Sequence, residues 1–182
     1  MQTLRYPNSE YRRFNNYADA LGYMNQEATN IIEVETHSDI IMMFDGGSRG
    51  NPGKSGSGVV IIDKYQRQWR GYKYLGEHKT NNEAEYEGMI IGLKYIHHHR
   101  MYNIRFEIQG DSKLVINQMQ GVWSCNTEHL RRKLMEAKLL LKDINDVTFK
   151  WIPRERNQIA DQLSNDAMDT ESSSMPYTVK FN

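Results

Sequence analysis

A glycine-rich segment between two short apolar runs is the feature that most constrains the fold of this chain. The runs, Ile40–Phe44 and Val59–Asp63, contain mostly apolar and β-branched residues and are too short for typical helices. The segment between them contains Gly46, Gly47, Gly50, Pro52, Gly53, Gly56 and Gly58. Because glycine and proline favour turns, the pattern predicts two strands joined by a turn-rich loop.

Alternating strand and helix patterns continue along the chain. Residues 69–75 alternate as a third strand, and residues 104–108 alternate as a fourth. Between them, Ala84, Gly88 and Ile91 recur at steps of three and four, which indicates one face of a helix over 82–99. We further expect helices over 112–119, 127–143 and 157–168 and a strand over 147–152. The order βββαβααβα predicts an α/β fold with a five-stranded mixed sheet flanked by helices.

Composition limits the class of protein. At 182 residues, 38% hydrophobic and 25% charged, the chain resembles an ordinary single soluble domain. Its longest apolar runs are far shorter than the roughly 20 residues of a membrane-spanning helix, and its N-terminus lacks the apolar core of a signal peptide. Cys125 is the only cysteine, which excludes an intramolecular disulfide. We therefore expect a protein of the cytoplasm, a reducing intracellular compartment.

The formal charge is balanced, with 23 Lys plus Arg against 23 Asp plus Glu. The strongly basic composition of many nucleic-acid-binding proteins is therefore missing. Because non-specific affinity grows with the number of phosphates neutralised, binding to nucleic acid must come from local patches. The expected helix 127–143 carries the candidates Arg131, Arg132, Lys133, Lys138 and Lys142. These residues are equally compatible with a hydrated helix face.

Four acidic residues fall at the ends or starts of the expected elements. Asp45 ends the first strand, Glu85 opens the helix 82–99, Asp111 follows the fourth strand and Asp161 lies in the last helix. If the sheet brings them together, these carboxylates repel one another unless divalent cations neutralise them. Two such ions about 4 Å apart stabilise the attacking and leaving oxygens of phosphoryl transfer. Spacing alone leaves ordinary surface acids as an alternative.

Local motifs around the acids resolve that alternative. In chain order they read Asp45-Gly46-Gly47-Ser48-Arg49-Gly50-Asn51-Pro52-Gly53, Thr80-Asn81-Asn82-Glu83-Ala84-Glu85, Gly110-Asp111-Ser112 and Asn157-Gln158-Ile159-Ala160-Asp161. One such motif would be weak, since glycine-rich loops follow strands in many folds. Together, and in this order, they resemble the type 1 ribonuclease H family over about residues 38–168. The resemblance implies the ribonuclease H-like fold.

The resemblance also implies an activity and a metal site. Members of the family are endonucleases that hydrolyse the RNA strand of RNA/DNA hybrids by a two-metal-ion mechanism, leaving 5′-phosphate and 3′-hydroxyl ends. It implies two Mg²⁺ ions per site, for which Mn²⁺ substitutes. Asp45 would bridge both ions, Glu85 and Asp111 would complete one site, and Asp161 would help to hold the other.

Two neighbouring acids compete with Glu85 for its role. Glu83 and Glu87 lie two residues to either side of it. The family spacing Asn-Asn-x-x-Glu selects Glu85. We expect Glu83 and Glu87 to be solvated charges on the helix surface.

Four polar residues match family positions that contact the hybrid: Asn51, Thr80, Asn81 and Asn82. An RNA strand displays 2′-hydroxyl groups along a shallow minor groove, so polar side chains that read them select hybrids. The same residue types also form turns and cap helices, and that role does not exclude a substrate contact.

The chain departs from many family members in the segment before the last acid. Many members carry a histidine there, but residues 151–157 contain none. The segment resembles a compact branch of the family in which Pro-Arg-Glu precedes the asparagine. Arg154, Glu155 and Asn157 are therefore candidate auxiliary residues, and either Arg154 or Glu155 would partly replace the histidine.

The resemblance divides the chain into three parts. We expect an N-terminal extension of unknown role over 1–37, a catalytic domain over 38–168 and a flexible C-terminal tail over 169–182. The expected partner is an RNA/DNA hybrid, with no membrane contact, and the expected state is a monomer. Four alternatives stay open: a catalytically silent hybrid-binding module of the same fold, the ribonuclease H fragment of a reverse transcriptase, a structural or scaffolding protein in which the acids are incidental, and an enzyme that cuts double-stranded RNA or resolves junctions.

Overall fold

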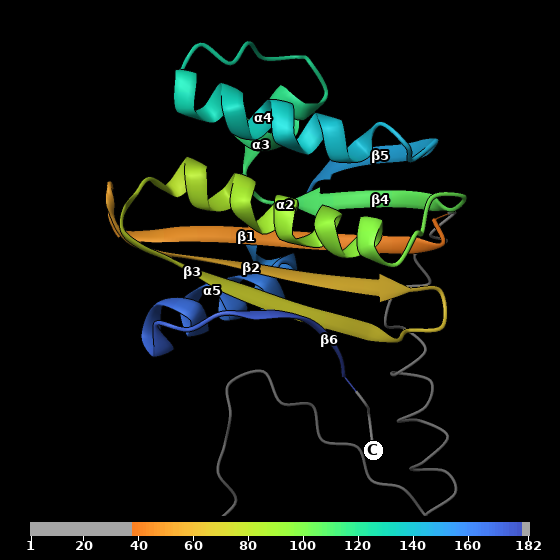
Figure 1. Cartoon of the computed structure of the whole chain (residues 1–182), viewed down its shortest axis with the longest axis horizontal. Coiled ribbons are helices and arrows are strands. Elements are labelled where there is room, and N and C mark those ends of the chain that lie inside the picture. The colour runs from red at the N-terminus through yellow and green to blue at the C-terminus, as the bar shows by residue number, and fades with distance from the viewer. Residues whose placement is uncertain (1–37, 180–182) are drawn as a thin grey trace, which may run out of the picture. The chain divides into compact units, whose positions relative to one another are not determined.

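The computed structural model describes residues 38–179, and Figure 1 shows their arrangement. The expected extension over 1–37 lies outside the described residues. A six-stranded sheet has the order β5-β4-β1-β2-β3-β6. Its strands are β1 (Ile40–Gly50), β2 (Gly53–Asp63), β3 (Gln68–Lys79), β4 (Arg105–Gly110), β5 (Asp146–Trp151) and β6 (Ser174–Val179).

The sheet is mixed, as the sequence predicted. Strands β1, β2 and β3 form an antiparallel meander. Strand β4 runs parallel to β1, and β5 runs parallel to β4. Parallel neighbours place their carboxyl ends at the same edge of the sheet, and this edge carries two of the predicted acids.

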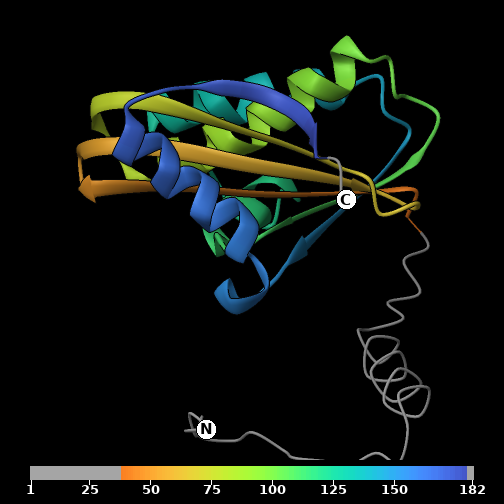
Figure 2. The ribbon, with the colours of Figure 1, turned by 90° about the horizontal axis from the view of Figure 1, so that it is seen from below.

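Helices cover both faces of the sheet. They are α2 (Asn81–His98), α3 (Lys113–Met119), α4 (Glu128–Leu141) and α5 (Gln158–Thr170), with a short 3₁₀ turn, η1 (Arg154–Arg156), before α5. Helix α5, drawn in blue, lies on one face, and α2, drawn in green, lies on the other (Figure 2). None of the helices between residues 38 and 179 has the length and apolar character that a membrane crossing requires.

Two details of the sheet correct the sequence-based expectations. The glycine-rich segment is not a long loop, because β1 and β2 stay paired as far as Gly50 and Gly53. Glycine keeps its backbone hydrogen-bonding groups, so a ladder can continue through it wherever packing compensates its low strand propensity. The sheet also has six strands rather than five, since Ser174–Val179 pairs antiparallel with β3. Pro176 hides this strand from pattern analysis, yet an edge strand tolerates proline.

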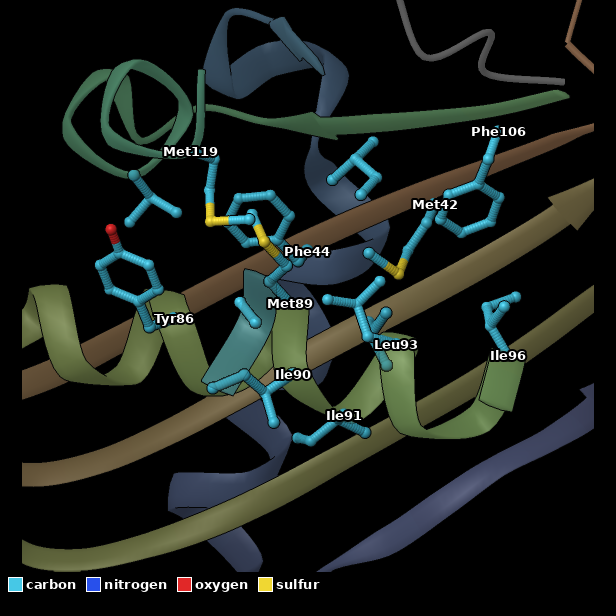
Figure 3. Close-up of a cluster of buried hydrophobic side chains, with 14 of the residues drawn as sticks. Met42, Phe44, Tyr86, Met89, Ile90, Ile91, Leu93, Ile96, Phe106 and Met119 are labelled. Carbon is cyan, nitrogen blue, oxygen red and sulfur yellow. The ribbon is translucent and has the colours of Figure 1, made fainter. Parts of the chain in front are cut away.

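The main core lies between the sheet and the helices on the α2 side. Figure 3 shows Met42 and Phe44 of β1 meeting Met89 and Leu93 of α2, with Phe106 of β4 beside them. All five side chains are essentially inaccessible to water. This packing fixes α2 against β1, and with it the acid near the start of the helix.

Glycines let the helices approach the strands closely. A Cβ atom on Gly46 would lie 2.1 Å from the backbone carbon of Ala84 in α2, and one on Gly58 would lie 2.3 Å from the carbonyl oxygen of Ala160 in α5. Distances this short are incompatible with any side chain. Gly46 and Gly58 of the glycine-rich segment therefore serve helix packing on the two faces of the sheet, and Gly58 pairs with Asp45 across β1 and β2.

Candidate active site

Three of the four predicted acids converge at the carboxyl ends of β1 and β4. Phe44 pairs with Gly110 across the parallel strands, so Asp45 and Asp111 occupy the next position on each. Asp45 does not end β1, as the sequence suggested, because the strand continues in its pairing with β2. It does directly follow the part of β1 that pairs with β4, and the end of this pairing leaves room for a site.

Glu85 reaches the same point from the first turns of α2. A capping box fixes the start of the helix: Thr80 Oγ1 accepts from the backbone N–H of Glu83, and the Glu83 carboxylate accepts from the N–H of Thr80 at 3.0 Å. Carboxylate oxygens of Asp45, Glu85 and Asp111 all lie within 4.8 Å of one another.

Two polar side chains hold the carboxylates in place. Ser164 of α5 donates its hydroxyl to Asp45 Oδ2 at 2.5 Å. Asn157, which is fully buried, donates its amide to Asp111 Oδ1 and to the carbonyl oxygen of Phe44, both at 2.8 Å. Asn157 therefore links the ends of β1 and β4, which gives this predicted auxiliary residue a positioning role.

Asp45 and Glu85 have raised pKa values, because burial and the neighbouring carboxylates both disfavour the charged form. Burial raises the pKa of Asp45 to about 6, against the hydrogen bond from Ser164, and the charges of Asp111 and Asp161 add to the rise. Burial, followed by the charges of Asp45 and Asp111, raises the pKa of Glu85 well above its usual range. Oxygen Oε2 of Glu85 is buried without a hydrogen-bond partner among the described residues.

The donor set fits divalent metal ions. Three carboxylates lie close together, and one of their buried oxygens has no donor in the described part of the chain, an arrangement that is costly in a protein without a cation. Hard ions such as Mg²⁺ take oxygen ligands of this kind. Residues Asp45, Glu85 and Asp111 can therefore hold a metal ion.

The fourth acid, Asp161, lies outside the group of three carboxylates and forms an ion pair with an arginine. Arg154 of η1 donates to Asp161 Oδ1 at 2.5 Å, and the Asp161 charge raises the pKa of Arg154 above its usual range. Both residues line a cavity of about 340 Å³ with the other three acids. The remaining lining residues are Gly46, Gly47, Ser48, Arg49, Asn81, Ser164, Asn165 and Met168.

Glu83 and Glu87 are not the solvated charges that the sequence suggested. Glu83 closes the capping box and pairs with Lys79 at 3.2 Å. Glu87 is only 5% exposed and forms ion pairs with Lys73 of β3 and Lys133 of α4. Because α4 covers α2, this face of the helix is buried rather than hydrated. Both glutamates are engaged in structural contacts, and Glu85 alone faces the other acids.

Of the four predicted substrate-binding residues, only Asn81 is among the residues that line the cavity. Asn51 Oδ1 accepts from the N–H of Asn81 at 3.1 Å, and Asn81 Oδ1 accepts from the N–H of Ser48 at 2.7 Å. These bonds tie the β1–β2 turn to the start of α2. Asn81 lines the cavity, whereas Thr80 serves as the helix cap and Asn82 makes no described side-chain hydrogen bond.

The structure also distinguishes among the candidate auxiliary residues and the basic residues of α4. Glu155 is exposed and does not line the cavity, in contrast to Arg154. On α4, Arg131 and Arg132 pair with Glu128, and Lys133 pairs with Glu87, so these cations are partly neutralised.

Sequence reasoning missed two of the side chains that build the site. Ser164 and Asn165 lie three and four residues after Asp161, so they share its face of α5. Asn165 donates to the backbone carbonyl oxygen of Asp161 at 2.9 Å. Their spacing of three and four residues from Asp161 could have identified them in the sequence.

Comparisons with known proteins agree with this geometry. Residues 43–167 match the family model described as reverse transcriptase-like. Ribonuclease HI of Halobacterium salinarum is 35% identical over 157 residues, covering 84% of this chain and 77% of that protein. The bifunctional protein Rv2228c of Mycobacterium tuberculosis is 36% identical over 137 residues, 74% of this chain. The match spans only 37% of that mycobacterial relative.

Solved structures give the same result. The structure of LC11-RNase H1 in complex with an RNA/DNA hybrid is 37% identical, with a TM-score of 0.69, and the match covers 72% of this chain and 98% of that one. The RNase H1 of Halobacterium salinarum is 36% identical, with a TM-score of 0.67, and the match again covers 72% of this chain and 98% of the other.

Proposed function

Because this chain belongs to the type 1 ribonuclease H family, we propose that it is an endonuclease that hydrolyses the RNA strand of RNA/DNA hybrids. The observation that carries the proposal is the convergence of Asp45, Glu85 and Asp111 within 4.8 Å beside a cavity. A similar structure, LC11-RNase H1, has been solved with such a hybrid.

The proposal includes a two-metal-ion mechanism. Asp45, Glu85 and Asp111 would hold one Mg²⁺, and Asp45 with Asp161 would hold the second, with Mn²⁺ as a substitute. When bound, the two ions supply charge that stabilises the attacking and leaving oxygens of phosphoryl transfer. The products would carry 5′-phosphate and 3′-hydroxyl ends.

The chain's own residues orient the site. Ser164 and Asn157 hold the carboxylates of Asp45 and Asp111, so these groups do not rotate away when a phosphate approaches. Arg154 is 72% exposed and lines the cavity, so its guanidinium can leave Asp161 and bind the phosphate being cleaved. Arg154, rather than Glu155, is our candidate for the role of the missing histidine.

Four polar residues near the start of α2 and in the β1–β2 turn would select the hybrid. We place Asn51, Thr80, Asn81 and Asn82 along the minor groove, where amides and hydroxyls can read 2′-hydroxyl groups. Of these, Asn81 has the strongest support, because it lines the cavity beside the acids. We also propose that the protein acts as a monomer in a reducing compartment, which gel filtration and fractionation of the source cells test.

Cleavage of labelled nucleic acids tests the proposed function. An RNA/DNA hybrid, single-stranded RNA, duplex RNA and duplex DNA are each incubated with Mg²⁺, Mn²⁺ or EDTA, with Asp45→Asn as the control. We expect metal-dependent cutting of the hybrid's RNA strand, lost in the variant, and 5′-phosphate ends on the products. Hybrid binding without cleavage under either metal would contradict the proposal and favour the silent module.

A further inference from the structure

Arg49 is a second arginine in the catalytic cavity, and the proposed reaction leaves it without a role. It lies near the end of β1 and is one of the residues that line the cavity with the four acids. Its guanidinium forms an ion pair with Asp169 of α5 at 2.6 Å. The two side chains are 47% and 57% exposed, so this pair contributes little to stability and opens readily.

Helix α5 sets the distance between the two arginines. Asp161, Asn165 and Met168 line the cavity at helical steps of four and three, so the cavity runs along one face of α5. Arg154 is paired with Asp161, and Arg49 is paired with Asp169, eight residues further on. At about 1.5 Å per residue, the two carboxylate positions are about 12 Å apart along the helix axis.

We propose that Arg49 binds a backbone phosphate of the strand being cleaved, a few nucleotides from the scissile phosphate. This inference rests on the proposed function. A strand lying along α5 passes from Arg154 and the four acids to Arg49, and a guanidinium binds phosphate oxygens in a two-pronged geometry. Asp169 holds Arg49 in place until the phosphate takes over its hydrogen bonds.

The surroundings of Arg49 support this role. Its neighbour Ser48 is tied to Asn81, the best-supported substrate residue, by a 2.7 Å hydrogen bond. Arg49 also lines the same cavity as this proposed minor-groove contact. The chain has no excess of positive charge, so a cation inside the cavity is a direct source of phosphate affinity.

A matched control lies on the same hairpin. Lys54, at the start of β2, forms a 2.6 Å ion pair with Glu171, just after α5. Like Arg49, it ties the β1–β2 hairpin to the end of α5, but it does not line the cavity. Lys54→Ala therefore removes an equivalent ionic contact and leaves the proposed phosphate contact intact.

The experiment compares Arg49→Ala, Arg49→Lys and Lys54→Ala in the full chain. For Arg49→Ala we expect KM for the hybrid to rise about tenfold with kcat within about twofold, because a charge-assisted hydrogen bond to the bound strand is lost. The salt dependence of hybrid affinity should lose about one unit of slope. Arg49→Lys should recover part of the affinity, and Lys54→Ala should match the parent protein.

Substrate length supplies the second readout. Hybrids are trimmed stepwise from each end of the RNA strand, and Arg49→Ala should stop raising KM once the strand no longer reaches residue 49. Equal KM and equal salt slopes for Arg49→Ala and Lys54→Ala would overturn the inference. A parent protein that cleaves no hybrid would contradict the proposed function instead. In that case the salt dependence of hybrid affinity in EDTA, compared between the parent and Arg49→Ala, would still test the role of Arg49.

Discussion

Two faces of helix α2 carry glutamates only two residues apart, yet their environments are opposite. Glu85 faces Asp45 and Asp111, and one of its buried oxygens has no donor among residues 38–179. Glu87, on the other face, accepts from Lys73 and Lys133. Burial raises the pKa of both, but at Glu87 the two lysines outweigh burial and the net pKa is lowered.

The difference separates an acid engaged in structural contacts from a candidate for metal binding. At Glu87 the protein supplies the counter-charges itself, and the ion pairs connect α2 to β3 and α4. Glu85 forms no ion pair within residues 38–179, and repulsion from the neighbouring carboxylates there is relieved only in part by the charge of Arg154, so an external cation would relieve it further. An acid that the fold leaves unsatisfied is a candidate for binding or catalysis, although its residue type and helix are the same.

The largest expected effect contrasts the two glutamates in catalysis. Glu85→Gln should lower kcat for hybrid cleavage by about 10³-fold or more, because the amide removes a charge from the proposed metal site. Glu87→Gln should keep kcat within about threefold of the parent value, because its partners lie outside the cavity. Steady-state kinetics at saturating Mg²⁺ checks both. Equal losses in the two variants would remove the distinction between the faces.

The next effect concerns the side chain that holds Asp45. Ser164→Ala removes the 2.5 Å hydrogen bond to that carboxylate and should weaken Mg²⁺ binding by about 10–100-fold. The activity lost at low Mg²⁺ should return at high Mg²⁺, which a merely unfolded variant would not show. A Mg²⁺ titration of cleavage, with circular dichroism as the folding control, measures this. An unchanged Mg²⁺ midpoint would count against the positioning role of Ser164.

A third effect concerns stability without metal. The pKa of Asp45 is raised to about 6, so between about pH 4 and pH 6 the folded state binds more protons than the unfolded chain. In EDTA the free energy of unfolding should therefore fall by about 1–3 kcal/mol across that interval as pH rises. Asp45→Asn should reduce this decline, to which the raised pKa of Glu85 also contributes, and should be the more stable protein at pH 7. Urea unfolding from pH 4 to pH 7 decides, and a flat profile for the parent protein would refute the argument.

The comparison also explains how far sequence reasoning reached. The order of elements, the mixed sheet and the convergence of Asp45 and Asp111 were predictable, because hydrophobic period and parallel strand ends are local or topological properties. The capping box of Glu83 with Thr80 was also a local pattern that the sequence could have revealed. The partners of Glu87 were not predictable, because Lys73 and Lys133 reach it only through tertiary packing. The spacing of Glu87 in the sequence does not predict that α4 covers it and brings Lys133 into contact.

The glycine-rich segment shows the same limit from another direction. Its residues predict turns, and their effect on helix packing appears only when α2 and α5 are in place. Gly46 and Gly58 admit the backbones of these two helices from opposite faces of the sheet. Glycine is typical both of turns and of places where helices and strands pack closely. The sequence alone therefore predicts a loop for this segment. Strand β6 was not predicted for a related reason, because it forms only by pairing with β3.

The smallest expected effect tests the paired face by its own pH dependence. Because the pKa of Glu87 is lowered, its ion pairs contribute stability above its unfolded pKa of about 4.3 and lose it as pH falls through the lower folded value. Glu87→Gln should cost about 1–2 kcal/mol at pH 7, a modest value because Lys73 and Lys133 remain partly hydrated. The cost should shrink toward pH 3, opposite in sign to the effect at Asp45. Urea unfolding at pH 3 and pH 7 measures it, and a cost independent of pH would show that Glu87 acts by packing rather than by charge.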